Sequence, residues 1–293
     1  MNLSRKFNFP DAVILAFLGI ITLVFLFPFY QTVILSFSKA GDLQAGKVFI
    51  FPVSFDLSAY EYLIEEGKMV RGAGVTIFIT ILGTFLSLSV TTAGAYALTK
   101  KAMPGRNLIM NGIILTMFFG GGLIPYFLTV QKVGLANNVL VMIIPVMINT
   151  FNLVLMKNFL SSIPLELEES AKIDGANEII ILIRIIVPVS APIIATIALF
   201  YAVDRWNEWW HAMIFINDTT KYPLQLVLRE AIVNITKVLA DATAAAMAER
   251  TRTYYQESVK AAIIVVSAVP ILLVYPFLQR HFVKGIMIGS IKG

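Results

Sequence analysis

One stretch of this 293-residue chain concentrates side chains that can bind a polar solute. The stretch runs from about residue 189 to 216, is mostly apolar, and holds all 3 tryptophans of the chain together with several ionisable residues. Aromatic rings stack on the apolar faces of sugars, while carboxylate, amide and guanidinium groups bond to sugar hydroxyls. These residue types indicate a translocation path, for which a sugar is one suitable solute, lined by Asp204, Arg205, Trp206, Asn207, Glu208, Trp209 and His211.

The same residues also have a structural interpretation, which the sequence leaves open. Charges inside a membrane are costly and generally face protein or water, and Arg205 and Glu208 stand three apart, so they can pair on one helix face. Tryptophans form belts at the membrane edge, where long charged side chains reach the lipid headgroups. Arg205 and His211 would suit an acidic sugar, whereas Asp204 and Glu208 argue against one.

The chain contains few residues that could support other kinds of chemistry. With 0 cysteines and 2 histidines, His211 and His281, we expect no metal site and no cofactor bound by this chain. An intramembrane enzyme would need a nucleophile–base pair, and His211 has no serine in its own motif. The chain has no G-x-x-x-x-G-K-[ST] loop for a nucleotide, and the net charge of +5 lacks the clustered basic face that nucleic acid requires.

The composition indicates that these residues belong to an integral membrane protein. Hydrophobic residues make up 58% of the chain and charged residues 14%, whereas a soluble domain carries about 25% charged residues. Because backbone groups in hydrocarbon must satisfy their own hydrogen bonds, spans of roughly 20 apolar residues are helices. The sequence predicts an all-α fold with six transmembrane helices, at about 13–37, 73–98, 108–130, 139–156, 189–216 and 259–278.

Kinks and orientation follow from a few further residues. The glycines at 120–122 with Pro125, and Pro145, are expected to kink or unwind the third and fourth spans. The short loop after span two holds Lys100, Lys101 and Arg106 without an acid, which favours both termini in the cytoplasm. We expect an N-terminal helix with an external loop (1–69), a five-helix transport domain (70–281) and a cytoplasmic tail (282–293).

The segment between spans four and five, about 161–188, is predicted to form a short helix–turn–helix outside the membrane. Pro164 suits a first helical turn, and Ser161 or Ser162 is expected to cap that helix. Gly175 is expected to end the helix in a left-handed turn, and Asn177 to cap the next one. On these grounds alone the segment is either a docking element for another protein or an ordinary amphipathic connector.

A gapped motif in this segment resembles the "EAA" loop of bacterial ABC importer permeases, whose pattern is E-A-A, three residues, G, nine residues, I-x-L-P. The matching residues here are Glu169-Ser170-Ala171, Gly175 and Ile185-Ile186-Val187-Pro188, with Ser replacing the first Ala and Val replacing Leu. The resemblance implies that the loop is the coupling helix that docks onto the ATPase subunit. Its implied coupling residues are Glu169, Ser170, Ala171, Asp174, Gly175 and Pro188.

Other motifs resemble the maltose-type carbohydrate-uptake branch of these permeases. Trp206-Asn207 is similar to a "WN" signature, and the segment 282–293 is similar to the Lys-Gly-ending tail of that branch. The stretches 120–125 and 221–225 look most similar to permeases for complex oligosaccharides, uronate-containing ones included.

The resemblance implies a permease subunit in the bacterial inner membrane that moves an oligosaccharide by alternating access. Its implied partners are a second homologous permease, a dimer of ATPase subunits that bind ATP and Mg, an extracytoplasmic solute-binding protein, the carbohydrate and membrane lipid. The alternative is an ion-coupled secondary transporter, which would carry inverted repeats and ion-coupled buried acids. No repeat is visible in the sequence.

Overall fold

The computed structural model describes residues 9–39, 42, 51, 54–65, 67–240, 257–270 and 272–273. Throughout these ranges the regular structure is helical, apart from one isolated antiparallel bridge between Ser38 and Phe55, so the all-α prediction is confirmed for the described chain. The chain divides into two compact units, Met1–Gly67 with Arg229–Val269, and Lys68–Leu228 with Pro270–Gly293. The predicted tail at 282–293 lies outside the described residues.

The first unit contains the long helix α1 (Phe9–Ser36), the short helix α3 (Ser58–Glu65) and a helical stretch at 257–269. The end of α1 is held by an aromatic stack, because the Phe37 ring lies 5.0 Å from both the Phe55 and Tyr60 rings. The Tyr60 hydroxyl donates to Ser36 Oγ at 2.7 Å, and the Ser258 hydroxyl donates to the Ser38 carbonyl at 3.0 Å. The apolar window of α1 is 0% buried within this chain, as a lipid-facing span requires.

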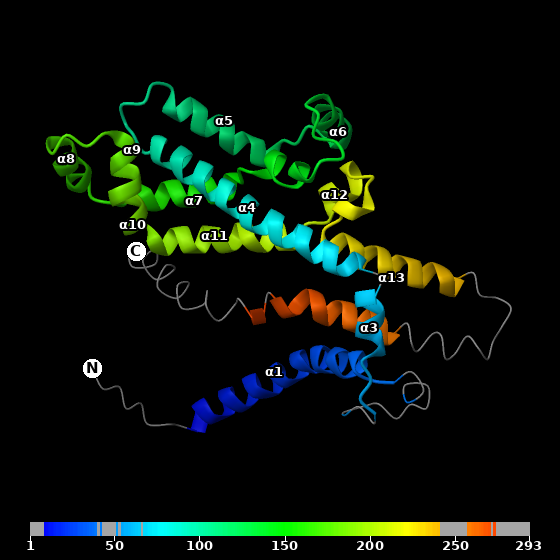
Figure 1. Cartoon of the computed structure of the whole chain (residues 1–293). Helices are drawn as coiled ribbons and strands as arrows, with labels where there is room; N and C mark the ends of the chain where they lie inside the picture. The colour runs from blue at the N-terminus through cyan, green and yellow to red at the C-terminus, as the bar shows by residue number, and fades with distance from the viewer. Residues whose placement is uncertain are drawn as a thin grey trace. The chain divides into compact units, whose positions relative to one another are not determined.

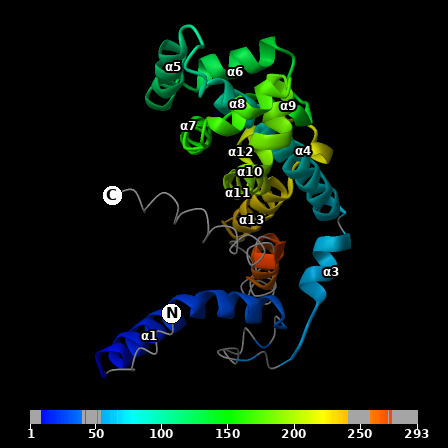
Figure 2. The ribbon, with the colours of Figure 1, turned by 90° about the vertical axis from the view of Figure 1, so that its left-hand side faces the viewer.

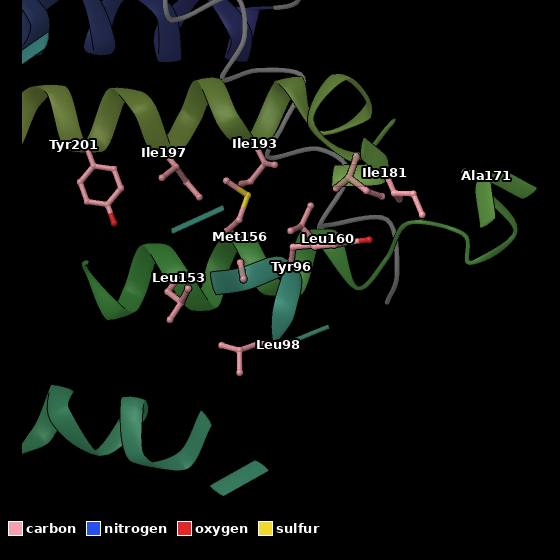
Figure 3. Packing of buried hydrophobic residues seen from close by; sticks show 12 residues of the cluster. Tyr96, Leu98, Leu153, Met156, Leu160, Ala171, Ile181, Ile193, Ile197 and Tyr201 are labelled. Carbon is pink, nitrogen blue, oxygen red and sulfur yellow. The ribbon is translucent and has the colours of Figure 1, made fainter. Parts of the chain in front are cut away.

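The second unit is built on three helices that pack side by side, α4 (Lys68–Ala97), α7 (Thr150–Leu160) and α11 (Ala191–Trp206) (Figure 1). Ile193, Ile197 and Tyr201 form a row on α11, and Met156 of α7 points toward this row (Figure 3). The buried face of α4 consists largely of small residues, which let the neighbouring helices approach closely. These buried positions are Gly72, Thr76, Gly83, Ser87, Thr91, Thr92 and Ala95.

Shorter helices of this unit lie at the two ends of the three-helix core (Figure 1). At one end are α8 (Glu166–Ile173), α9 (Glu178–Ile181), the π-helical turn η3 (Leu182–Ile186) and α10 (Val187–Val189). At the other end are α6 (Leu123–Lys132) and α12 (Trp210–Phe215). The remaining elements of this unit are α5 (Arg106–Phe118), η1 (Val139–Met142), η2 (Ile144–Val146) and η4 (Thr219–Lys221). Helix α13 (Leu224–Ala240) begins in this unit and continues into the first unit from Arg229.

Two of the predicted spans are broken rather than straight, and a third bend falls at the start of the fifth. The pairs α5–α6, η1/η2–α7 and the segment Glu178–Val189 with α11 bend by 118°, 49° and 87°. The first break falls at the predicted glycines, where Gly122 has a φ of 82°, and the second follows Pro145. The fifth predicted span, 189–216, is also interrupted, because α11 ends at Trp206 and α12 begins at Trp210. Among the described residues, only α1 and α4 are single helices long and apolar enough to cross a membrane. If each bent pair counts as one span, the described chain has up to five candidate spans.

Candidate functional site

Two groups of predicted site residues lie at opposite ends of the second unit (Figure 1), and the first is the loop around α8, at the end that faces the viewer in Figure 2. Helix α8 begins at Glu166, with three acids in its first turn at the positive end of the helix dipole. The predicted serine cap is wrong: Ser161 and Ser162 donate instead to the carbonyls of Lys157 and Phe159, at the end of α7. Both serines therefore belong to the end of α7. Helix α8 begins only at Glu166 and has no side-chain cap.

Gly175 ends α8 as predicted. Its φ is 82°, its N–H donates to Lys172 O at 3.0 Å, and the Ala176 N–H donates to Ala171 O at 2.9 Å. This pair of bonds is the Schellman motif, in which a left-handed residue lets the chain turn back on the last helical carbonyls. The Asn177 side chain then accepts from the Ile180 N–H at 2.9 Å and caps α9, which confirms the second capping prediction.

The predicted coupling residues divide into an inward and an outward group. Ala171 is 7% exposed and belongs to the core that α4, α7 and α11 share, so its small side chain serves packing. Glu169, Ser170, Asp174, Gly175 and Pro188 are exposed, and Ile173 between them is 87% exposed. The loop therefore presents a polar rim around an apolar side chain that this chain leaves uncovered. Pro188 lacks the N–H that a helix interior uses, and the π-helical turn η3 ends two residues before it.

An ionic network that the sequence did not predict fastens this loop to the end of α4. Lys100 forms a salt bridge with Glu168 and lies 3.2 Å from Glu178 Oε2. The Tyr96 hydroxyl donates to Glu178 Oε2 at 2.7 Å, and Lys172 Nζ lies 2.7 Å from Glu178 Oε1. Hydrogen bonds from Lys172 and Tyr96 lower the pKa of Glu178 to about 2, so its carboxylate is charged at any physiological pH. The only sequence signal was the acid-free basic loop that contains Lys100.

The second group lies at the far end of α11, and there Arg205 is not open to solute. Its side chain is 3% exposed, and Nη2 donates to the Val146 carbonyl at 2.6 Å and to Ser87 Oγ at 3.4 Å. The pair with Glu208 expected from the spacing is not formed among the described residues, because α11 ends at Trp206 and the chain leaves the helical register. Nε of Arg205 has no hydrogen-bond partner within the described chain.

Glu208 bonds instead to the start of α12. Its two carboxylate oxygens lie 2.8 Å from the His211 backbone nitrogen and 2.9 Å from His211 Nδ1. Glu208 is 8% exposed, so this carboxylate is also turned into the protein. His211 packs edge-on against Trp210 and Tyr126, with ring centroids 4.8 and 6.1 Å apart. The two groups that would suit an acidic sugar, Arg205 and His211, are thus already engaged inside the chain.

Asp204 and Asn207 remain the open polar residues of the predicted path. Both are exposed at the end of α11, and the Asn207 amide donates back to the Val203 carbonyl at 2.9 Å. Trp206 and Trp209 are half-buried beside them. The structure brings these residues together at one helix end, and it separates them from the buried pair Glu208–His211 and from Arg205.

Comparison with known proteins identifies the kind of molecule that carries these two sites. A family model described as "Binding-protein-dependent transport system inner membrane component" matches residues 92–288. The chain belongs to this family. It is a transport subunit of the bacterial inner membrane, and not an enzyme.

The relatives within this family cover almost the whole chain. Protein LplC of Bacillus subtilis (strain 168) is 44% identical over 291 residues, which is 99% of this chain and 96% of LplC. The polygalacturonan/rhamnogalacturonan transport system permease protein YtcP of the same organism is 38% identical over 283 residues, 97% of this chain and 98% of YtcP. A crystal structure of a bacterial ABC transporter involved in the import of the acidic polysaccharide alginate has a chain of 36% identity and TM-score 0.84, covering 96% of this chain and 99% of that one.

Proposed function

We propose that this permease moves an acidic, uronate-containing oligosaccharide inward across the cytoplasmic membrane. The observation that carries the proposal is the similarity, over nearly the full length, to a chain of the alginate importer and to a permease named for polygalacturonan and rhamnogalacturonan. These polymers share a carboxylate on the sugar ring. A common substrate chemistry in two relatives of more than a third identity favours the same chemistry here.

In this proposal the chain crosses the membrane six times, with both termini in the cytoplasm. The broken pairs α5–α6 and η1/η2–α7 are the third and fourth spans, α11 followed by α12 is the fifth, and the helix at 257–270 begins the sixth. The loop from 161 to 188 is then cytoplasmic, on the same side as Lys100 and Lys101. The acid-free basic loop and the salt bridge of Lys100 to Glu168 support this arrangement.

The exposed rim of the α8 loop is the surface that docks onto the ATPase. Ile173 is 87% exposed at the C-terminal end of α8, where a partner's apolar pocket can bury it. Glu169 and Asp174 flank it and offer carboxylates to basic side chains of the partner. Gly175 leaves the backbone open, since no atom lies within 4 Å of the position where its Cβ would stand.

The complete importer contains a second permease, two ATPase subunits that bind ATP and Mg, and an external solute-binding protein. ATP and the sugar-loaded binding protein each bind one conformation of the importer more tightly than the other, and so shift the equilibrium toward it. The α8 loop transmits closure of the ATPases to α7 and α11. Asp204, Asn207, Trp206 and Trp209 supply the contacts to the passing sugar from this chain. Recognition of the sugar's carboxylate falls to the partners, because Arg205 and His211 are occupied.

Uptake by the reconstituted importer tests the proposal. Proteoliposomes with both permeases, the ATPases and the binding protein are given oligogalacturonate, oligomannuronate or neutral maltotriose with internal ATP. We expect ATP-dependent uptake of at least one acidic oligosaccharide and none of maltotriose. Uptake of maltotriose alone would overturn the acidic substrate, and uptake driven by an ion gradient without ATPase would support a secondary transporter instead.

A further inference from the structure

The break in the fourth span leaves backbone groups without helical partners. Between η2 and α7 the chain runs through residues 147–149, where the helix bends by 49°. Backbone groups in such a break must be satisfied by other parts of the protein, since hydrocarbon offers no hydrogen bonds. The Val146 carbonyl and the Asn149 N–H are the two groups that flank it.

Two side chains of α11 bind these two groups. Arg205 Nη2 donates to the Val146 carbonyl at 2.6 Å, and the Asn149 N–H donates to the Tyr201 hydroxyl oxygen at 3.1 Å. Tyr201 and Arg205 are four residues apart, so they lie one above the other on the same face of α11. The break is therefore held at both of its ends by one helix.

The same two side chains are also fastened to α4. The Tyr201 hydroxyl lies 2.7 Å from Thr91 Oγ1, and Arg205 Nη2 lies 3.4 Å from Ser87 Oγ. Ser87 and Thr91 are again one turn apart, so the contacts form two matched layers, each joining α4, α11 and the broken span. Ser87 and Thr91 are 0% exposed, and Tyr201 is 1% exposed.

Burying the guanidinium at this depth is costly unless it makes specific bonds. The fold makes room for it: a Cβ on Gly83 of α4 would stand 3.0 Å from Arg205 Nε and 3.1 Å from its Cδ. The side chain thus fills a space that α4 leaves open, and its charge is aimed at a carbonyl and a hydroxyl. This arrangement serves to hold a backbone and not to meet a solute.

We propose that Arg205 and Tyr201 are positioning residues that brace the broken fourth span to the α4–α11 pair. The brace has a consequence for coupling, because α7 enters the α8 loop and α11 is reached from it through α9, η3 and α10. The two helices that flank the coupling loop are thereby tied together at their other ends. Movement of the loop displaces α7, α11 and η2 as one body. The transport consequence rests on the proposed function, whereas the brace does not.

Hydrogen exchange at the break, measured on the complete importer in nanodiscs, tests the brace. Tyr201→Phe removes the acceptor of the Asn149 N–H and leaves the ring in place. Exchange of the peptide containing 147–149 should accelerate by about threefold to tenfold, the effect of losing one intramolecular hydrogen bond. Tyr126→Phe is the matched control, because that hydroxyl has no hydrogen-bond partner within the described chain, and exchange at 147–149 should not change.

Arg205→Met and Arg205→Lys separate the brace from contact with solute and from general instability. We expect Arg205→Met to accelerate exchange at 147–149 and to lower the sugar imported per ATP hydrolysed by about threefold or more, since one hydrogen-bonded charge is lost. Arg205→Lys keeps a donor for the Val146 carbonyl, so it should restore much of the slow exchange at 147–149 and much of the sugar imported per ATP. Equal loss of hydrolysis and transport would indicate instability and overturn the positioning role.

The remaining outcomes also decide the question. If Arg205→Met lowers transport while exchange at 147–149 is unchanged, Arg205 acts on the solute and the brace is wrong. If Tyr201→Phe behaves like Tyr126→Phe, the brace is wrong as well. If the unaltered importer moves no acidic sugar but exchange responds as expected, the brace stands and the proposed substrate fails.

Discussion

Gly83 is the residue on which the position of Arg205 depends. A methyl group there would come within 3.0–3.1 Å of the Arg205 side chain, closer than van der Waals contact allows. Because Arg205 is buried and bonded to Val146, it cannot swing away without losing that bond. We expect Gly83→Ala to destabilise the protein by about 1–3 kcal/mol, as overpacking does elsewhere, and to lower its melting temperature in detergent.

Gly94→Ala on the same helix is the control for that substitution. Its added methyl would lie 3.6 Å from Leu153 Cδ1, an ordinary contact, so the melting temperature should stay the same or rise slightly. Equal effects of the two substitutions would contradict the tight fit at Gly83.

At single residues, the sequence predicted contacts between neighbours in the chain and missed those between helices. The Gly175 turn follows from the backbone freedom of glycine, and the Asn177 cap from a side chain that accepts from a backbone N–H three residues later. The Arg205–Glu208 pair failed because helical spacing has meaning only while the helix continues, and α11 ends between them. Nothing in the sequence states that Arg205 faces Gly83 or that Tyr201 reaches Asn149, since those partners are brought together by packing.

Helix α8 depends at its C-terminus on a backbone conformation that favours glycine. Asn tolerates the left-handed region better than other side chains do, whereas Leu is strained there. Nothing within this chain obstructs a side chain at 175, so any steric effect must come from a partner. We expect Gly175→Asn to change the free energy of unfolding of the chain by less than about 1 kcal/mol, and to lower transport and the affinity for the ATPase.

The affinity of the purified ATPase for the permease pair separates an effect on the stability of the chain from an effect on docking. Full affinity with Gly175→Asn would mean that the loop does not dock closely at this residue. Lys101→Gln, on the exposed neighbouring basic loop, is the comparison for a change that leaves α8 untouched.

The fastening of the α8 loop to α4 makes a prediction for Lys100. Lys100→Gln removes the cation shared by Glu168 and Glu178 and leaves their charges facing each other. Half-exposed pairs contribute about 0.2–1 kcal/mol each, so we expect the loop to loosen without unfolding of the core. Limited proteolysis after residue 160 should become faster, while the Lys101→Gln variant keeps the original rate.

The pH dependence of this fastening follows from Glu178. Its pKa is lowered from 4.5 to about 2, so its stabilising contribution is complete above about pH 5 and is lost as the pH falls toward 2. The rate of proteolysis of the unaltered loop should therefore be insensitive to Glu178 between pH 5 and 8, apart from the protease's own profile. A loss of protection near pH 6 would show that a different group controls the loop.

Among whole elements, apolar length predicted where the long apolar helical segments lie but not their shape. Glycines at 120–122 and Pro145 indicated the breaks correctly, because both residue types weaken a helix by known means. The 87° bend before α11 was not predicted, although Pro188 and Pro192 lie beside it. The direction of this bend depends on how the chain packs against the core of α4, α7 and α11. The number of apolar residues in a segment gives no information about that packing.

The breaks leave the number of crossings as the property of the whole molecule that most needs a test. Helix α5 has 13 residues, about 20 Å, before the chain bends by 118° into α6, and the hydrocarbon core is about 30 Å thick. Whether α5 and α6 together cross the membrane decides which side every later loop faces. The natural chain contains 0 cysteines, so a single introduced thiol reports its own side without background.

We expect Lys101→Cys to react with a membrane-impermeant maleimide only after spheroplasts are permeabilised, because the proposed topology places the acid-free loop before α5 in the cytoplasm. Ala136→Cys, between α6 and η1, and Thr219→Cys, in η4, should react in intact spheroplasts, since both positions are exposed and follow an odd number of crossings. Labelling of positions 101 and 136 from the same side would mean that α5–α6 is re-entrant. The α8 loop would then lie outside, where no ATPase can reach it, so this single result bears on the topology and on the coupling mechanism together.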